Sequence, residues 1–424
     1  MSARCRVAAP MTGPLHIAIV GYGTAGQACA LSLSRDGHRI EVFERVAQPG
    51  PVGAGFLLQP TGLQALWELG LLPAVLEHGV AIRRLFGETP SGRGVMDMRY
   101  RDLDPRLFGL GMQRGALFAL LADAWPGYAD IHRDHAIEEV DDARGRVRDQ
   151  HGRWHGPFDL VVVADGSASR LRDALGAHRI DRPYSWGALW CLLPQQAWPW
   201  PDELRQRYVG ARKMIGMLPV GTAPHDATPR MSFFWSLPAH TFDDWRAAGA
   251  QPWLREIARI WPQAREALGD TFDAGRLSRA TYRDAVPRRW WRNRVVLTGD
   301  AAHAMSPQLG QGVNMALIDA LALRDALRGH RGLDAALQAY QQARRSHVDI
   351  YHFWSRWLTP LFQSDHDFVA GVRDAAFLPL GRMPGGRGHM LRVLTGTQRG
   401  VFGRHALAAE FFEALDRSND AFES

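Results

Sequence analysis

Lysine, cysteine and long apolar runs are scarce in this sequence, and each scarcity excludes a class of protein. Lys213 is the only lysine among 50 basic residues, so arginine carries the formal net charge of +6 and the pI of about 9.6. The chain has no basic run and no basic stripe interleaved with aromatic residues. A nucleic-acid-binding surface needs such a cluster. We therefore predict a mildly basic protein with no nucleic-acid partner.

Cysteine occurs at three widely spaced positions, Cys5, Cys29 and Cys191. An odd and sparse set fits neither a disulfide framework nor a cysteine-rich zinc site. The sequence thus predicts a protein of a reducing compartment, the cytoplasm, and it offers no recognisable metal site.

Apolar runs are all shorter than the roughly 20 residues that cross a bilayer, so integral membrane association is not expected. Residues 1–13 lack the apolar stretch of a signal peptide, and we predict a flexible extension there. The composition, 46% hydrophobic and 22% charged over 424 residues, is that of a globular protein with more than one layered unit.

The first motif has the order strand, glycine loop, helix, strand. A β-rich run at 15–20 leads into the loop Gly21-Tyr22-Gly23-Thr24-Ala25-Gly26, followed by a predicted helix at 24–36 and a second strand at 39–44. This order within about 30 residues is that of the Rossmann unit, which binds a dinucleotide.

Each glycine of this loop has its own physical task. Gly21 permits the tight turn, Gly23 leaves space for a pyrophosphate, and Gly26 lets the helix approach the sheet. The N–H groups and the positive dipole end of the helix favour the phosphates. Glu44, at the end of the second strand, can accept hydrogen bonds from ribose hydroxyls. It argues against a 2′-phosphate but does not distinguish FAD from NAD.

The second motif is a carboxylate at a strand end. Residues 158–164 are predicted to form a buried strand, and Asp165-Gly166 follows directly. An Asp-Gly pair in isolation indicates no more than a turn. At the carboxyl end of a strand in an α/β sheet, however, it lies where ligands bind.

The third and most specific motif joins a predicted strand at 294–298 to a long apolar helix at 313–327. Asp300 is placed to accept a hydrogen bond from a polyol hydroxyl. Gly310 and Gly312 let backbone N–H groups approach a flat ligand at the helix start. A helix N-terminus favours negative charge on that ligand, and the reduced flavin ring carries such a charge.

Together the motifs resemble the para-hydroxybenzoate-hydroxylase-like (group A) FAD-dependent monooxygenases over about residues 14–365. The resemblance implies an NAD(P)H-consuming enzyme that uses FAD and O2 to hydroxylate a small phenolic or aromatic-acid-like molecule through a flavin C4a-hydroperoxide. NADH or NADPH would be the transient electron donor. The stretches that carry the resemblance are 21–26, Glu44-Arg45, Pro51-Val52-Gly53-Ala54-Gly55, Arg114 with Leu117, Asp165-Gly166, and Gly299-Asp300-Ala301-Ala302-His303.

The resemblance also implies which residues hold FAD. Glu44 would hold the adenosine ribose and Asp300 the ribityl chain. Asp165-Gly166 would border both FAD and the visiting nicotinamide nucleotide. Pro307 would lie with its backbone beside the reactive flavin carbon, the one catalytic position that we predict. The full predicted cofactor set is Gly21, Gly23, Thr24, Ala25, Gly26, Glu44, Arg45, Gly55, Arg114, Asp165, Gly166, Gly299, Asp300, Pro307, Gly310, Gly312, Val313 and Asn314.

Two neighbours in the third motif need separate mention. His303 is predicted to pack or to fix the loop, because the family chemistry does not need an acid or base there. Ala304 stands where many relatives have a second proline.

Between residues 181 and 284 the pattern changes to a sheet that would cover the substrate. Trp186, Trp190, Phe233 and Trp235 offer flat apolar surface to an aromatic ring, and core packing is the alternative role of each. The expected elements are strands at 184–193, 213–219 and 231–235, turns at 194–201 and 221–229, and helices within 243–268.

The predicted fold class is α/β, with a Rossmann-type FAD-binding domain, an inserted and mostly antiparallel substrate-binding sheet, and a C-terminal helical segment. The FAD-binding domain would comprise 14–180 and 285–340, including a sheet hairpin near 91–109. Residues 181–284 would form the substrate-binding sheet, and 341–424 the C-terminal helical region.

Several alternatives share parts of the pattern. A flavin-dependent halogenase is disfavoured, because Trp198-Pro-Trp200-Pro only superficially resembles its Trp-x-Trp-x-Ile-Pro signature and Lys213 is badly placed. A flavin-dependent reductase or dehydrogenase of a lipid or polyprenyl substrate and a non-catalytic flavin-binding regulator are two others. The aromatic run at 351–362 is either a helix packed on the FAD-binding domain or a patch for a membrane surface or lipid-like substrate. The chain fits a monomer or a homodimer.

Overall fold

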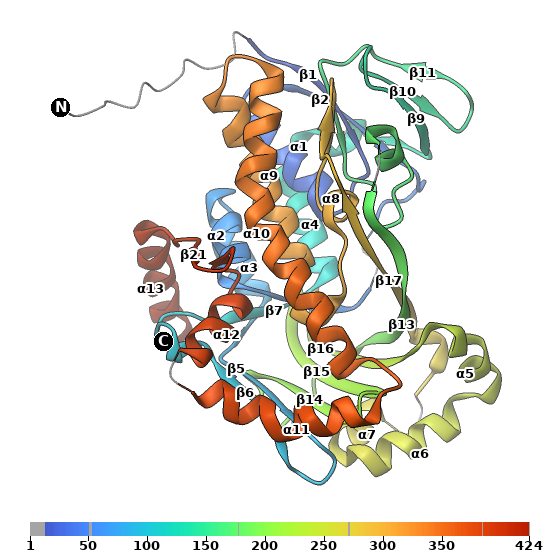
Figure 1. The fold of residues 1–424 in the computed structure, drawn as a ribbon, viewed down its shortest axis with the longest axis vertical. Coiled ribbons are helices and arrows are strands. Elements are labelled where there is room, and N and C mark those ends of the chain that lie inside the picture. Colours follow the sequence, from blue (N-terminus) through green and yellow to red (C-terminus); the bar gives the residue numbers. More distant parts are fainter. Residues whose placement is uncertain (1–12, 51–52, 177, 270–271, 384, 424) are drawn as a thin grey trace.

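The computed structural model describes most of the chain, and Figure 1 shows its course. The predicted extension at 1–13 falls almost entirely outside the described residues, as do Cys5 and the pair Pro51-Val52. The described residues are 13–50, 53–176, 178–269, 272–383 and 385–423.

A six-stranded sheet forms the Rossmann unit, and all its pairings are parallel except the one between β18 and β19. β1 and β12 are buried almost throughout, as strands covered on both faces must be. Val20 pairs with both Phe43 and Val163, and Val163 with Leu297, so the strands carrying the three motifs end at one edge. In spatial order the strands are β18 (Trp291–Arg292), β19 (Val295–Leu297), β12 (Leu160–Val163), β1 (His16–Val20), β2 (Arg39–Glu44) and β8 (His132–Arg133).

Helices and a small sheet pack around the Rossmann unit. α1 (Thr24–Arg35) and α9 (Gly312–Gly329) lie against each other as the first layer. A three-stranded sheet lies beside β1 and β2 (Figure 1), where the ring of Phe43 contacts that of His155. Its strands are β9 (Ile137–Asp141), β10 (Arg146–Asp149) and β11 (Trp154–His155).

A seven-stranded sheet forms the second unit, and all its pairings are antiparallel except the one between β14 and β5. The hairpin predicted near 91–109, within the FAD-binding domain, lies instead at 84–99 and extends the seven-stranded sheet. In spatial order the strands are β17 (Ser278–Pro287), β13 (His178–Pro194), β16 (Asp226–Pro238), β15 (Lys213–Ala223), β14 (Glu203–Val209), β5 (Arg84–Glu88) and β6 (Gly94–Arg99).

The turn predicted at 221–229 is present but shorter than expected. β15 ends at Ala223 and β16 begins at Asp226, and these two residues pair across the turn. Gly221 has φ of +64° at a register shift of the ladder, so this glycine marks a bulge within the strand instead of its end.

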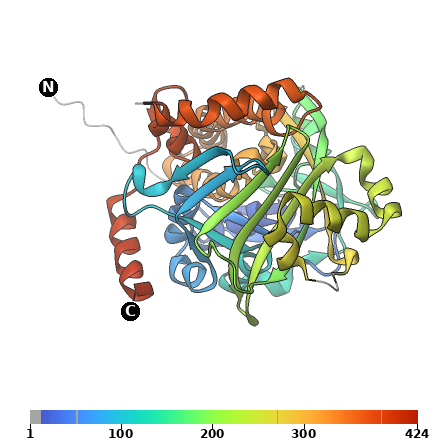
Figure 2. The same cartoon turned by 90° about the horizontal axis from the view of Figure 1, so that it is seen from below.

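Three helices cover the outer face of this sheet, as Figure 2 shows: α5 (Phe242–Ala248), α6 (Ala250–Ile260) and α7 (Pro262–Leu268). α10 (Leu333–Phe362) extends from the Rossmann unit to the seven-stranded sheet (Figure 1). It begins the C-terminal helical segment, which the structure confirms. Among the described residues, no helix combines the length and the apolar character that crossing a bilayer requires.

The remaining elements connect these units. They are β3 (Gly55–Leu58), β7 (Gly109–Gln113) and β4 (Val80–Ile82), which form a small sheet in that order, α2 (Pro60–Glu68), α3 (Leu72–His78), α4 (Arg114–Ala124), α8 (Asp300–His303), α11 (Asp367–Arg382), α12 (Gly386–Leu394), the pair β20 (Gln398–Arg399) and β21 (Gly403–Arg404), and α13 (Ala409–Glu423).

Candidate active site

The three motifs meet through close contacts between small residues. Gly21 has φ of +96°, and a Cβ there would lie 2.6 Å from the carbonyl oxygen of Ala164. A Cβ at Gly299 would lie 2.8 Å from the Cβ of Ala25. Ala25, Ala164 and Ala316 form one small buried cluster. The fold therefore joins segments that lie about 20, 165 and 300 residues along the chain.

Two glycines of the first loop differ in their surroundings. A methyl group at Gly26 would collide with the carbonyl oxygen of Gly21, so Gly26 serves the close approach of α1 to the sheet. Gly23 is exposed, and no heavy atom lies within 4 Å of the position that its Cβ would take. α1 begins there with no capping side chain and no acidic residue in its first turn. The N–H groups of Thr24 and Ala25 therefore border open space beside Gly23.

Glu44 lies half-buried at the end of β2. Its Oε2 accepts a hydrogen bond from the backbone N–H of Tyr22 at 2.7 Å, and its Oε1 accepts one from Val46 at 3.1 Å. These bonds fix the carboxylate beside the glycine loop, and each oxygen keeps a lone pair for a ribose hydroxyl. The next residue, Arg45, is exposed. Burial raises the pKa of the nearby Asp165, and the positive charge of Arg45 opposes this rise.

Asp165 is half-buried at the end of β12, and burial raises the pKa of its carboxyl. Its Oδ1 is buried and has no hydrogen-bond partner among the described residues. Arg172, which was not predicted, is fully buried and donates to the carbonyl oxygens of Gly166, Ser167 and Ser169. This guanidinium holds the loop after Asp165 in one shape.

The third motif opens onto accessible space. Gly310 and Gly312 are exposed, and α9 begins at Gly312 with no capping side chain. Asp300 is also exposed, and its Oδ1 lies 3.8 Å from the position of a Cβ at Gly312. Pro307 begins a short 3-10 turn and is half-buried, like Val313. Uncapped N–H groups and a carboxylate thus face the same space.

Asn314 is fully buried, and its side chain is engaged within the protein. Its Oδ1 accepts from the backbone N–H of Gln59 at 2.8 Å, and its Nδ2 donates to the carbonyl of Gly310 at 3.2 Å. Only the backbone N–H of Asn314 is therefore left for a ligand at the helix start.

A buried ionic cluster supports this motif from behind. Asp319 accepts hydrogen bonds from the backbone N–H of Gly299 at 2.8 Å, from His303 Nε2 at 2.5 Å and from Arg344 Nε at 2.6 Å. All three side chains are at most 3% exposed. The charges of His303 and Arg344 hold the pKa of Asp319 well below its ordinary value against the opposing effect of burial. His303 fixes the loop as predicted, whereas Asp319 and Arg344 were not predicted.

Arg114 begins α4 and interacts electrostatically with Asp300 and Tyr282. Desolvation by the surrounding protein lowers the pKa of its guanidinium, and the negative charge of Asp300 opposes this effect. Gly53 contacts this side chain closely, since a Cβ there would lie 3.0 Å from the Cδ of Arg114. Gly55 instead packs on the sheet, donating its N–H to Ser232 Oγ at 3.1 Å.

These surroundings fit FAD. The open positions at Gly23, Gly310 and Gly312, two helix starts without capping side chains, and the unpartnered Oδ1 of Asp165 offer what its phosphates, ring and ribityl chain require.

One face of the seven-stranded sheet carries aromatic residues that pack in a hydrophobic cluster with Phe362 of α10. Trp190 and Phe234 share this face, with ring centroids 5.1 Å apart. Trp190 Nε1 donates to the hydroxyl of Tyr282 at 3.2 Å, and Tyr282 interacts electrostatically with Arg114. Burial raises the pKa of Tyr282 to about 12. Phe234 and Tyr282 were not predicted. Phe234 lies between the predicted Phe233 and Trp235, whereas the sequence neighbours of Tyr282 are not aromatic.

The other predicted aromatic residues are not all brought here. Phe233 and Trp235 lie on the opposite face, fully buried, and their rings contact Trp253 of α6. Trp186 is buried. It lies four residues before Trp190 along β13, and because side chains alternate along a strand, it lies on the same face of the sheet as Trp190.

Comparisons with known proteins agree with this arrangement. A family model described as an FAD binding domain matches residues 15–351. The chain is 30% identical over 359 residues to kynurenine 3-monooxygenase of Salinispora arenicola, covering 79% of this chain and 77% of the relative. It is 29% identical over 345 residues to a probable 2-heptyl-3-hydroxy-4(1H)-quinolone synthase of Rhodococcus erythropolis, with coverages of 78% and 84%.

The fold also matches a solved structure. A crystal structure of a Klebsiella pneumoniae HpxO variant complexed with FAD is 24% identical, has a TM-score of 0.74, and is matched over 92% of this chain and 100% of that chain. The comparisons favour neither a lipid reductase nor a non-catalytic regulator. The chain belongs to the FAD-binding family of para-hydroxybenzoate-hydroxylase-like monooxygenases, and it is an FAD-dependent, NAD(P)H-consuming aromatic hydroxylase.

Proposed function

We propose that this enzyme hydroxylates a nitrogen-bearing aromatic ring that binds against Trp190 and Phe234. The observation that carries the proposal is the row of interactions that links Trp190 to Tyr282, and Tyr282 and Asp300 to Arg114. The two relatives described above are named for kynurenine and for a quinolone, and both compounds contain nitrogen attached to or within an aromatic ring.

The row offers two kinds of contact. Trp190 is half-buried and offers flat apolar surface, on which an aromatic ring gains free energy by stacking and area burial, while the buried Phe234 supports its ring from the core. The Tyr282 oxygen accepts from Trp190, so its own hydroxyl hydrogen is free for the substrate. Because its pKa is about 12, this phenol stays protonated near neutral pH and donates. A ring with a carbonyl or anionic oxygen beside its nitrogen suits such a donor.

The cofactor residues would divide FAD between them. The loop at 21–26 and the start of α1 would bind the pyrophosphate, Glu44 the adenosine ribose, and Asp300 the ribityl chain. The start of α9 would face the flavin ring. FAD, when bound, takes electrons from NAD(P)H and uses them to activate O2. The protein's part is to position the ring and to exclude water, which the apolar face of Trp190 and Phe234 serves.

The test measures NAD(P)H oxidation and O2 uptake by the purified yellow protein against matched aromatic compounds. One set carries a ring or exocyclic nitrogen, and the other is the carbocyclic phenols and benzoates of the same size. We expect the nitrogen-bearing set to accelerate oxidation and to yield product labelled from ¹⁸O2. Acceleration by phenols or benzoates alone would overturn the substrate class while leaving the hydroxylase assignment intact.

The division into domains is also part of the proposal. The seven-stranded sheet and α5–α7 have a hydrophobic core of their own, separate from that of the Rossmann unit, which supports a substrate-binding unit at 181–284. A cytoplasmic setting is supported by the buried free thiols of Cys29 and Cys191 and by the need for NAD(P)H.

A further inference from the structure

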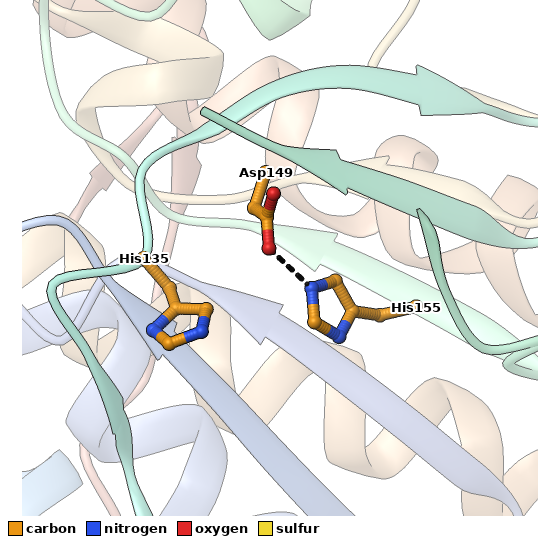
Figure 3. Close-up of side chains that lie close together, drawn as sticks. All are labelled: His135, Asp149 and His155. Atoms are coloured by element: carbon orange, nitrogen blue, oxygen red, sulfur yellow. Dashed lines mark hydrogen bonds and ion pairs between the residues drawn. The ribbon is translucent and has the colours of Figure 1, made fainter. Parts of the chain in front are cut away.

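A group of metal-ligating side chains lies away from the FAD site, between β2 and the small three-stranded sheet. His135, Asp149 and His155 each direct one ligand atom into the group, and these atoms all lie within 4.8 Å of one another. Figure 3 shows the two imidazole rings on either side of the carboxylate. Asp149 is 1% exposed and both histidines are half-buried, so the group is built into the fold.

The hydrogen bonds around the group orient its ligand atoms. His135 Nδ1 lies 2.7 Å from the carbonyl oxygen of Arg133. A carbonyl only accepts, so Nδ1 carries the hydrogen and Nε2 carries the lone pair, which points toward Asp149 and His155 in Figure 3. Metal-bound histidines commonly donate their second ring N–H to a carbonyl in this way.

The two carboxylate oxygens of Asp149 have different partners: one binds backbone N–H groups and the other faces the imidazole of His155. Oδ1 accepts from the backbone N–H groups of His151 at 2.9 Å and of Arg153 at 3.0 Å, which fixes the turn between β10 and β11. Oδ2 faces His155 Nε2 at 2.7 Å. One oxygen is therefore held rigidly while the other is presented to the two imidazoles.

We propose that His135 Nε2, Asp149 Oδ2 and His155 Nε2 bind one divalent first-row transition-metal ion, with water completing the coordination. Two imidazoles and one carboxylate suit Zn²⁺ and its neighbours, whereas Mg²⁺ prefers oxygen ligands. A tetrahedral ion with bonds of about 2.0–2.1 Å holds its ligand atoms roughly 3.3 Å apart, which side-chain rotations can reach from the present separations.

The site would fasten the loop behind Glu44. The backbone N–H of His135 donates to the carbonyl of Glu44 at 2.9 Å, and that of Asp134 donates to Val46 at 3.3 Å. A metal ion would cross-link this loop to β10 and β11. It would therefore stabilise the folded protein in proportion to its occupancy.

The experiment uses tag-free holoprotein washed with EDTA and dialysed, because a histidine tag would itself bind metal. Calorimetric titration with ZnCl2 is expected to show one ion per chain, and MgCl2 is expected to show none. H135Q and H155Q should each weaken Zn²⁺ binding at least roughly 100-fold. H151Q is the matched control and should bind as the wild type does, since His151 is exposed and contributes only its backbone N–H.

Thermal unfolding tests whether the variants fold and whether Zn²⁺ stabilises them. In EDTA, wild type, H135Q and H151Q should melt alike, which shows that the variants fold. Added Zn²⁺ should raise the melting temperature by a few degrees in wild type and H151Q, but not in H135Q. Absence of 1:1 binding to wild type, or binding that survives both H135Q and H155Q, would overturn the proposal.

Discussion

In the loops that we propose to bind FAD, open space is left by missing side chains, whereas at the seven-stranded sheet aromatic side chains fill the space. Gly23, Gly310 and Gly312 are exposed, and the first two have no heavy atom within 4 Å of the position of a Cβ. Trp190 and Phe234 instead fill space with their rings, whose centroids lie 5.1 Å apart.

The difference between the two regions affects what a substitution does. If the loops bind FAD as proposed, a side chain added to a loop glycine would occupy the place of the cofactor, so its effect on binding would be all or none. A side chain altered on the sheet changes one contact among several, so its effect is graded. Changes in the loops should therefore act on FAD retention, and changes on the sheet should act on KM.

The largest effect is expected within the first loop, where Gly23 and Gly26 can be compared directly. Gly23→Val should fold but retain no FAD, because the side chain fills the open space beside the helix start. Gly26→Ala should lower the free energy of unfolding by roughly 1–3 kcal/mol or more, because its methyl group meets the carbonyl oxygen of Gly21. The flavin absorption of the purified proteins and their far-UV melts separate the two results. A normally folded, fully yellow Gly23→Val protein would contradict the assignment of this loop to FAD.

The second prediction concerns the ionic support of the third motif. Asp319→Asn should lower the free energy of unfolding by roughly 3–5 kcal/mol, because it leaves the buried Arg344 without its counter-charge. Denaturant unfolding followed by flavin fluorescence at neutral pH measures this. An Asp325→Asn variant, altered at an exposed carboxylate of the same helix, should change little.

The pH dependence of stability gives an independent check on Asp319. Its pKa is depressed in the folded protein, so it contributes stability above the ordinary aspartate pKa of about 3.9. That contribution is lost as the pH falls below this value toward the folded-state pKa. The stability difference between wild type and Asp319→Asn should therefore narrow in acid. A difference that stayed constant from neutral to strongly acidic pH would contradict the ionic role.

A smaller effect is expected at Asp300. Asp300→Ala should fold normally, since this carboxylate is exposed, and should weaken FAD binding by about 1.5–3 kcal/mol, or roughly 10- to 150-fold. The measurement is a fluorescence titration of the apoprotein with FAD, and Asp325→Ala is the matched control. Unchanged FAD affinity in Asp300→Ala would exclude it as a ribityl ligand.

The same contrast between loops and sheet explains what could be predicted from the sequence. The loops depend on backbone geometry, which glycines and strand-end carboxylates indicate directly in the sequence. The predicted strand at 39–44 and the predicted helix at 24–36 agree with the structure to within one residue. The FAD-facing side of the substrate sheet depends on strand parity. Phe233 and Phe234 are adjacent and both aromatic, so composition alone could not assign them to opposite faces.

Long-range partners were the other features that could not be predicted. Arg172, Asp319 and Arg344 act through contacts with backbone or with residues up to 25 positions away, and nothing in their local patterns distinguishes them from surface charges. The group of His135, Asp149 and His155 likewise could not be predicted from local sequence patterns. Their spacing matches no known metal-binding pattern, and only the packing of the small sheet against β2 brings them together.

The smallest effect is expected on the sheet, where two tryptophans on opposite faces can be compared. Trp190→Phe keeps an aromatic ring but removes the N–H that donates to Tyr282, a hydrogen bond of about 0.5–1.5 kcal/mol. With a substrate identified by the panel above, its KM should rise roughly 2- to 12-fold. Trp235→Phe should leave KM unchanged and lower the melting temperature, because Trp235 packs on Trp253 in the core beneath α6. The reverse result, a raised KM in Trp235→Phe alone, would move the substrate to the other face of the sheet. That result would leave the FAD site intact, because none of the cofactor residues lies on the Trp235 face.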